Sequence, residues 1–236
     1  MSSNALKVIA MISMLIDHIG YVLLPEEVVL RYIGRIAFPI YCFLLVEGFF
    51  HTRNIIKYLA RMGIFALLSE IPFNLAMAGT LIYSEHTNVF LTLFIGLLVM
   101  YFSEAAYKTT GDQSMGMVFC IAGMICAGIL HTDYSYAGVM IIYIFYLSWR
   151  GRNSEDVKTR GLTTVLMLIM QTIMFLSFKG QIENYAIISL VFILLYTGKK
   201  SGRIWEALHL NKIDIFMKYF FYLFYPLHLL VLYILK

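Results

Sequence analysis

Charged side chains are scarce in this sequence. They make up 14% of its 236 residues, whereas hydrophobic residues make up 61% and the mean hydropathy is +0.79. Soluble domains carry about 25% charged residues, so this chain has too little polar surface to cover one. The charges gather in short stretches between apolar runs, which is typical of a polytopic membrane protein.

Motifs of soluble enzymes are also missing. The chain has no P-loop, GxSxG, HExxH or CxxC, the motifs that mark phosphate binding, serine hydrolysis, zinc proteolysis and thiol redox chemistry. Its three cysteines (Cys42, Cys120 and Cys126) lie within apolar runs and form no metal or disulfide framework, and we expect no metal cofactor. The net charge of +4 does not indicate nucleic acid. Because the N-terminus lacks a charged n-region and a small-residue cleavage site, we expect the first helix to be retained.

Apolar runs of about 20 residues, the length that crosses a bilayer, recur along the whole chain. They predict an all-α polytopic membrane bundle of about nine transmembrane helices (eight to ten), forming a single domain over residues 1–236 with no soluble domain. The polar connection 198–214 contains RIWEALHL, a candidate surface helix. The expected spans are about 5–24, 29–50, 54–77, 88–107, 115–130, 135–149, 162–178, 184–197 and 215–235.

Lysine and arginine concentrate in alternate connections, for example at Arg53, Lys57 and Arg61 after the second expected helix. The connections between these hold mostly acidic residues, with Lys179 as their one basic residue. By the positive-inside rule, the N-terminus is cytoplasmic and the ninth helix ends on the outer side. We therefore expect a multi-pass protein of the inner, cytoplasmic membrane.

The first expected helix carries Lys7 and His18, eleven residues apart. That spacing is about three helical turns, so both side chains point the same way, roughly 16 Å apart along the axis. An ionisable residue inside a bilayer costs roughly 2.5–3.5 kcal/mol and is usually retained for function. Asp17 precedes His18, but adjacent side chains diverge by about 100° on a helix, so the two do not form a ready dyad.

Other polar residues fall into two groups by predicted depth. Toward the cytoplasm lie Lys7, Glu47, His51 and the basic stripe, defined as Arg53, Lys57 and Arg61. This stripe is either a positive-inside anchor or a phosphate site, and Arg31 and Arg35 either serve a site or extend to outer headgroups. Glu70 either serves the site or neutralises an arginine. Toward the outer side lie Asp17, His18, Arg31, Arg35, Glu70, Asn74, His86, Asn88, His131, Asp133, Tyr134 and His228.

Several strings in the chain resemble the TraX family, typified by the enzyme that acetylates the N-terminus of F pilin. They include LKVIAMISMLIDHIG, YIGRIAFPIYCFLLVEGFFHTRNIIKYLARM, LLSEIPFNLA, HTNVFLTLFIG, TDYSYAGVMIIYIFYL and FYLFYPLHLL. The basic residue, ten-residue gap and histidine also resemble the first helix of the broader transmembrane acyltransferases. The resemblance implicates Lys7, Asp17, His18, Arg35, Pro39, Glu47, Arg61, Glu70, Pro72, Asn88, Asp133, Tyr134, Pro226 and His228.

The resemblance implies a membrane acetyltransferase that uses cytoplasmic acetyl-CoA as co-substrate and has the lipid bilayer as its surroundings. The phosphates of acetyl-CoA would bind Lys7 and the basic stripe, and His18 would act as general base. Glu70 or Asp133 would orient His18, while Arg35 or Asn88 would stabilise the oxyanion. Asp17 joins this catalytic group, and the acceptor would bind near Arg31, Tyr134, His86 and His228.

Two other classes compete with this interpretation. A proton-coupled transporter of small solutes also uses buried His, Asp, Glu and Arg, although the chain shows no internal repeat. A non-catalytic membrane scaffold would not need His18 in mid-helix. The sequence leaves open whether the acceptor is a small molecule, a peptide amine, a glycan hydroxyl or a lipid headgroup, whether transfer is direct or passes through acetyl-histidine, and whether the chain forms a homo-oligomer.

Overall fold

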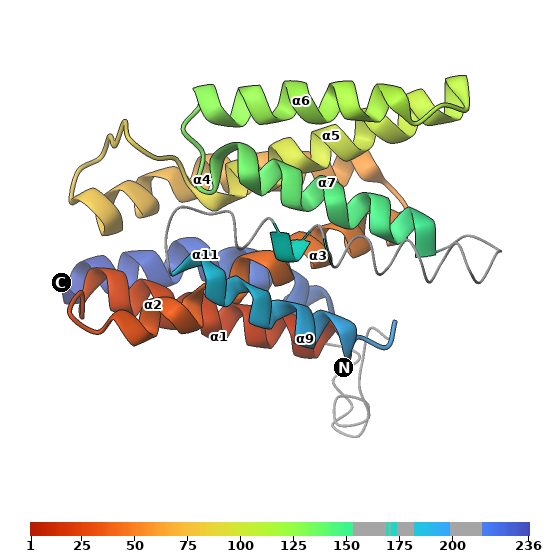
Figure 1. Cartoon of the computed structure of the whole chain (residues 1–236). Coiled ribbons are helices and arrows are strands. Elements are labelled where there is room, and N and C mark those ends of the chain that lie inside the picture. Colours follow the sequence, from red (N-terminus) through yellow and green to blue (C-terminus); the bar gives the residue numbers. More distant parts are fainter. Residues whose placement is uncertain (153–168, 170, 174–181, 199–213) are drawn as a thin grey trace. The chain divides into compact units, whose positions relative to one another are not determined.

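A computed structural model of the chain describes residues 1–152, 169, 171–173, 182–198 and 214–236 (Figure 1). The described residues form helices and no strand, with one isolated β-bridge between Thr87 and Thr132, which confirms the all-α prediction. The helices are α1 (Ser3–Val22), α2 (Val28–Gly34), α3 (Ala37–His51), α4 (Ile55–Ala78), α5 (Val89–Thr110), α6 (Ser114–Ile129), α7 (Ser135–Arg152), the 3₁₀ helix η1 (Glu183–Ile187), α9 (Ile188–Leu194) and α11 (Asp214–Leu235).

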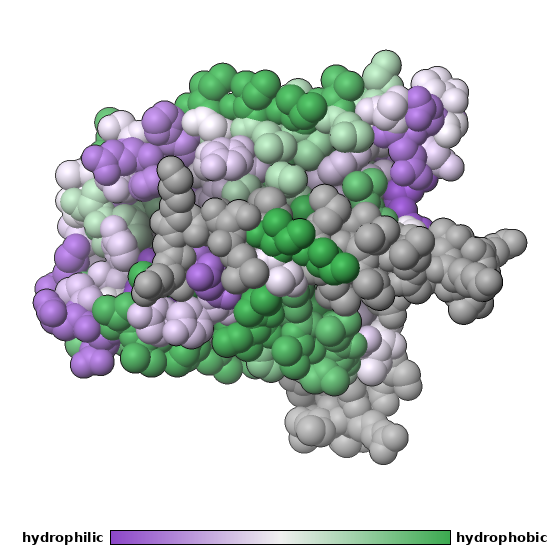
Figure 2. Space-filling model, viewed as in Figure 1, coloured by the Kyte–Doolittle hydropathy of each residue, from purple (hydrophilic) through white to green (hydrophobic). Residues whose placement is uncertain are grey.

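Four described segments are long and apolar enough to cross a membrane: 3–22, 28–51, 55–78 and 89–110. Shorter apolar helices cover 114–129, 183–194 and 219–235. Large apolar side chains remain exposed on these helices, as at Leu67 (80%) and Ile129 (71%), and Figure 2 shows apolar surface along α6. Such surface is what a lipid-facing helix presents. Most of the expected helix 162–178 and the segment RIWEALHL (203–210) lie outside the described residues, so the nine-helix count stays a prediction.

The expected continuous helix 29–50 is wrong in one respect. The structure divides it into α2 and α3, with a break at Arg35 and Ile36. Pro39 lies four residues after Arg35, has no N–H to donate to the Arg35 carbonyl, and would press its ring against that carbonyl in a continuous helix. Pro39 is tolerated in the first turn of α3, where its N–H would be unpaired anyway.

The described chain groups into two compact units. The first contains residues 1–44, 71–81 and the described part of 175–236. In it α1 packs along α2 and against α11 (Figure 1). The amine of Met1 donates to the Leu195 carbonyl, and the Thr197 N–H donates to the Met1 carbonyl at 2.9 Å. The end of α9 therefore lies beside the start of α1.

The second unit contains residues 45–70 and the described part of 82–174. Its centre is the packing of α5, α6 and α7 on one another. Gly96 and Gly123 permit this, because a Cβ at either position would lie 2.4 Å from a branched side chain of a neighbouring helix, Ile142 or Val99. Close approach at small residues is the usual way in which membrane helices pack.

Candidate functional site

Asp17 is the centre of a charged cluster in the first unit. Its Oδ2 lies 2.7 Å from Arg31 Nη1, and its Oδ1 lies 2.7 Å from Arg35 Nη2. Glu183, at the start of η1, places a carboxylate oxygen 3.9 Å from Arg35 Nη1. Two guanidinium groups and two carboxylates therefore balance in charge at a site where Asp17 is only 7% exposed. Burial of such charges is tolerated because each is paired.

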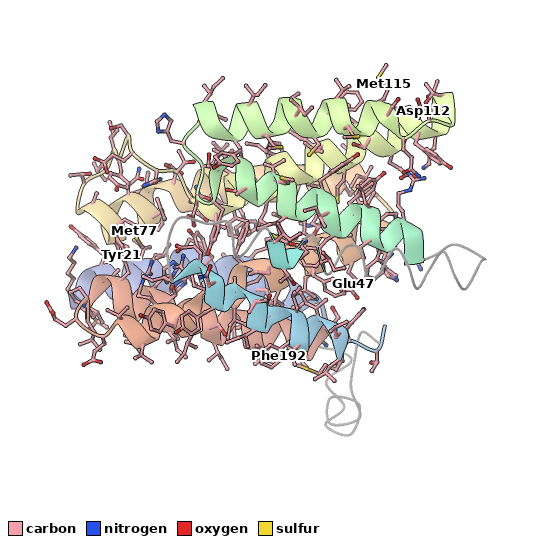
Figure 3. All side chains as sticks on the ribbon, viewed as in Figure 1. Tyr21, Glu47, Met77, Asp112, Met115 and Phe192 are labelled. Atoms are coloured by element: carbon pink, nitrogen blue, oxygen red, sulfur yellow. The ribbon has the colours of Figure 1, made fainter. Side chains whose placement is uncertain are left out.

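Gly34 allows this cluster to form. An added Cβ at Gly34 would lie 2.1, 2.2 and 2.4 Å from Asp17 Oδ1, Cβ and Cγ. The α2 backbone therefore approaches Asp17 closely, which brings Arg31 and Arg35 to the two carboxylate oxygens. Arg31 also lies over the ring of Tyr21, labelled in Figure 3, at 4.9 Å from its centroid.

His18, one residue along α1, contacts His228 of α11. His18 Nδ1 lies 2.6 Å from His228 Nε2, the ring planes are inclined by 17°, and the centroids are 4.9 Å apart. Stacked ring faces stay about 3.5 Å apart, so two nitrogens at this shorter distance meet edge to edge. The partner of His18 Nδ1 is therefore an imidazole, not a carboxylate as the sequence suggested.

The predicted common face of Lys7 and His18 is confirmed, because both residues contact α11. The Lys7 ammonium lies 5.6 Å from the Phe221 ring centroid, while the His18 ring meets Tyr225 edge-on at a centroid distance of 6.0 Å. The contact residues on α11 follow helical spacing. Lys7 near the start of α1 and His18 near its end thus share one helix surface.

The predicted residues Glu70 and Asn88 come together in the second unit. Asn88 is 1% exposed, and its side-chain amide donates to the Glu70 carboxylate and, at 2.8 Å, to the Ala66 carbonyl. Its side-chain oxygen accepts from the Phe90 N–H at 3.0 Å and caps α5. All hydrogen-bonding groups of this amide are therefore occupied by structural contacts.

Asp133 and Tyr134 lie in the turn before α7, in the same unit. The Asp133 N–H donates to the Thr87 carbonyl at 3.1 Å, and Tyr134 has a φ of 61°, which places it in the left-handed region. His86 precedes Thr87 and is exposed, with its ring 6.1 Å from that of Tyr83. These three predicted residues therefore belong to two adjoining connections.

The basic stripe also lies in the second unit. Arg53 and Lys57 are exposed, and Arg61 is half-buried over the Tyr58 ring at 5.5 Å. No carboxylate among the described residues pairs with any of the three. Cations at the start of a helix such as α4 are not favoured by its dipole, so the stripe is not explained by helix stability.

Comparison with known proteins identifies the chain. The family model described as TraX protein matches residues 2–236. The chain belongs to the TraX family. This TraX-family chain is 26% identical over 247 residues to the probable fimbrial assembly protein FimC, serogroup H1, of Dichelobacter nodosus, covering 98% of the chain and 94% of that protein. It is also 26% identical over 148 residues to the uncharacterized protein RP591 of Rickettsia prowazekii (strain Madrid E), covering 62% and 47%. No solved structure matches.

Sequence reasoning missed Glu183, Gly34 and a group of three further residues in this TraX-family protein. Glu183 lies in one of the mostly acidic connections, and neither it nor Gly34 is singled out by a local sequence pattern. In the second unit, Glu104 pairs with Arg150 at 3.3 Å and accepts from the Tyr146 hydroxyl at 3.0 Å. The spacing of Tyr146 and Arg150, four residues apart on α7, was the available signal for this last group.

Proposed function

We propose that this TraX-family protein is an integral membrane acetyltransferase that moves an acetyl group from cytoplasmic acetyl-CoA to an amine or hydroxyl acceptor at the outer side of the membrane. The observation that carries the proposal is the position of His18. It lies next to the buried Asp17 carboxylate, which is paired with Arg31 and Arg35, and on the same helix face as Lys7. The family resemblance supports the reaction class.

His18 is the general base in this proposal. It takes a proton from the acceptor N–H or O–H as the acceptor atom attacks the acetyl carbon. The C–S bond then breaks, and His18 returns the proton to the CoA thiolate, so that acetylated acceptor and CoA leave. A positioned base of this kind contributes about 10²–10⁴-fold to rate.

The oxyanion that forms on the acetyl oxygen needs hydrogen-bond donors. Arg35 and Asn88 were the sequence-based candidates, but Arg35 is held between Asp17 and Glu183, and the Asn88 amide is occupied. Arg31 uses only Nη1 on Asp17, and its Nε and Nη2 donate to none of the described residues. With its side chain 23% exposed, Arg31 is the better donor.

Lys7 in the first unit and the basic stripe in the second are each candidates to bind the phosphates of acetyl-CoA from the cytoplasmic side. The lack of a described carboxylate partner for Arg53, Lys57 and Arg61 supports this assignment, since lysine and arginine are common phosphate ligands. The acceptor would approach from the other side. The relative named for fimbrial assembly favours a peptide amine of an exported subunit over a glycan or lipid acceptor.

The test begins with the purified protein in detergent. Acetyl-CoA and CoA should raise the melting temperature of the wild type, and dephosphorylated CoA should raise it less. This stabilisation should weaken in Lys7→Ala and Lys57→Ala and remain in the matched control Lys108→Ala, which removes an exposed lysine elsewhere. If no CoA species stabilises the wild type, the proposal is wrong.

A transfer assay with radiolabelled acetyl-CoA and a synthetic peptide amine tests the base. His18→Ala should lose transfer but keep stabilisation by CoA, whereas the exposed His131→Asn control should keep both. Wild-type turnover in His18→Ala would exclude His18 as the base.

The alternative of a proton-coupled transporter has one observation in its favour, the contact between His18 and His228 in the plane of the rings, which would also pass protons. Uptake of a solute driven by a proton gradient in vesicles, without stabilisation by CoA, would support it.

A further inference from the structure

A chain of hydrogen bonds joins three groups of α1 and α11: the Phe224 carbonyl, the His228 imidazole and the His18 imidazole. His228 Nδ1 lies 2.7 Å from the Phe224 carbonyl oxygen one turn earlier, and His228 Nε2 lies 2.6 Å from His18 Nδ1. A carbonyl oxygen can only accept, so His228 Nδ1 carries a hydrogen. The position of that hydrogen determines which of the other ring nitrogens of His228 and His18 carry hydrogen.

A neutral imidazole has one N–H and one lone pair. His228 is 6% exposed, and no carboxylate among the described residues forms an ion pair with it, so a charged imidazolium there would be costly. With its hydrogen on Nδ1, His228 accepts at Nε2. The hydrogen between the two rings therefore belongs to His18 Nδ1, and His18 Nε2 keeps its lone pair.

The free lone pair is the one that a general base needs. His18 Nε2 makes no hydrogen bond with any residue in the described ranges. The opposite tautomer, with hydrogen on Nε2, would have nothing to give His228 Nε2, and two lone pairs would face each other at 2.6 Å. The pairing thus selects one tautomer of His18.

We propose that His228 is a positioning residue, which through its Nε2 holds His18 in the Nδ1–H tautomer and leaves His18 Nε2 free to take the acceptor proton. This inference rests on the proposed acetyltransferase function for its chemical meaning. The tautomer itself does not depend on that function, so the two can be tested separately. A residue that merely bound the acceptor would leave the His18 tautomer unchanged.

The direct test is nitrogen NMR of the ¹⁵N-histidine-labelled full-length protein in detergent without substrate. The His18 signals are assigned by their loss in His18→Ala. In the wild type, we expect His18 Nδ1 to be protonated and Nε2 to be unprotonated. In His228→Phe, which keeps a ring but removes the acceptor, the hydrogen should move to Nε2. In His228→Gln, whose amide oxygen can accept, the wild-type tautomer should persist.

The matching activity measurement uses the same variants. We expect transfer to fall by about 10²-fold or more in His228→Phe, in keeping with the usual contribution of a positioned base, and by less in His228→Gln. Stabilisation by CoA should not change, and His131→Asn should resemble the wild type in all measurements.

A wild-type His18 protonated at Nε2 overturns the inference, and it does so even if His228→Phe fails to fold. An unchanged tautomer in a folded His228→Phe protein overturns it as well. If His18 has the expected tautomer but no acceptor is acetylated in the presence of CoA thioesters, the positioning stands and the acetyltransferase proposal fails.

Discussion

Replacing Gly34 with alanine should disrupt the Asp17 cluster. The new Cβ would lie 2.2 Å from Asp17 Cβ, and carbon atoms need about 3.5 Å, so α1 and α2 must separate by about 1.3 Å. The strain cannot be relieved by a side-chain rotation alone, because Asp17 Cβ is attached to the α1 backbone. A shift of that size stretches both Asp17–arginine contacts of 2.7 Å beyond hydrogen-bond length.

The cost of the Gly34→Ala change can be worked out from its parts. Overpacking costs about 1–3 kcal/mol, and loss of a buried ion pair costs about 3–5 kcal/mol if it is complete. Alanine returns up to about 1 kcal/mol in helix propensity. We expect a net loss of about 3 kcal/mol or more in the free energy of unfolding, which for a chain of this length lowers the melting temperature by roughly 6–12 °C.

The assay is thermal unfolding in detergent, compared with the control Gly128→Ala. Gly128 also lies at the end of a helix, but the nearest atom to its added Cβ is Ser135 Oγ at 4.0 Å. That control should match the wild type or exceed it slightly. Equal melting temperatures for the two variants would refute the close approach of α2 to Asp17.

Three further predictions concern single side chains. Asp17→Asn keeps the shape but leaves its two arginine partners short of a negative charge, and chemical denaturation should show a loss of about 3–5 kcal/mol. Asn88→Leu removes the cap of α5 and the donor to the Glu70 carboxylate; it should cost about 2–4 kcal/mol in the same assay. Hydrogen bonds from the Ser114 hydroxyl and then its N–H lower the pKa of Asp112, which lies between α5 and α6 (Figure 3). The stability that Asp112 contributes is therefore present above its unfolded pKa of about 3.9 and lost as pH falls through the folded value; ¹³C titration should show a higher pKa in Ser114→Ala.

The positions of most helices could be predicted because apolar length and flanking polar residues decide them. The expected helix 54–77 is α4, Ile55–Ala78, and the expected 115–130 is α6, Ser114–Ile129. The break at Arg35 was missed because apolar length alone favours one uninterrupted span. Its cause, a proline four residues later, is a local steric effect that hydropathy does not contain.

The site was predictable only in part, for a different reason. The sequence shows that Arg31 and Arg35 share a helix face, but not that Asp17 lies opposite them, since that depends on how closely α2 approaches α1 at Gly34. The contact of His18 with His228 joins residues 210 positions apart, and no local pattern specifies such a pair. The sequence allowed us to predict the residue types of the site and their depth in the membrane. Which side chains pair with one another depends on helix packing and could not be predicted.

Asp17 and His18, which are neighbours on α1, obtain their contact partners at different times during synthesis of the chain. The partners of Asp17 follow it by 14 and 18 residues, so α1 and α2 can enter the membrane as a hairpin in which the Asp17 carboxylate is already paired. Glu183, which balances the second guanidinium, arrives later with η1. The partner of His18 follows by 210 residues, which at 5–20 residues per second is a delay of roughly 10–40 s. During that interval the cell holds a membrane intermediate with an unpaired histidine. The contact between His18 and His228 forms only when α11 has been made. A chain that stalls before α11 therefore has its Asp17 cluster paired but lacks the imidazole that contacts His18.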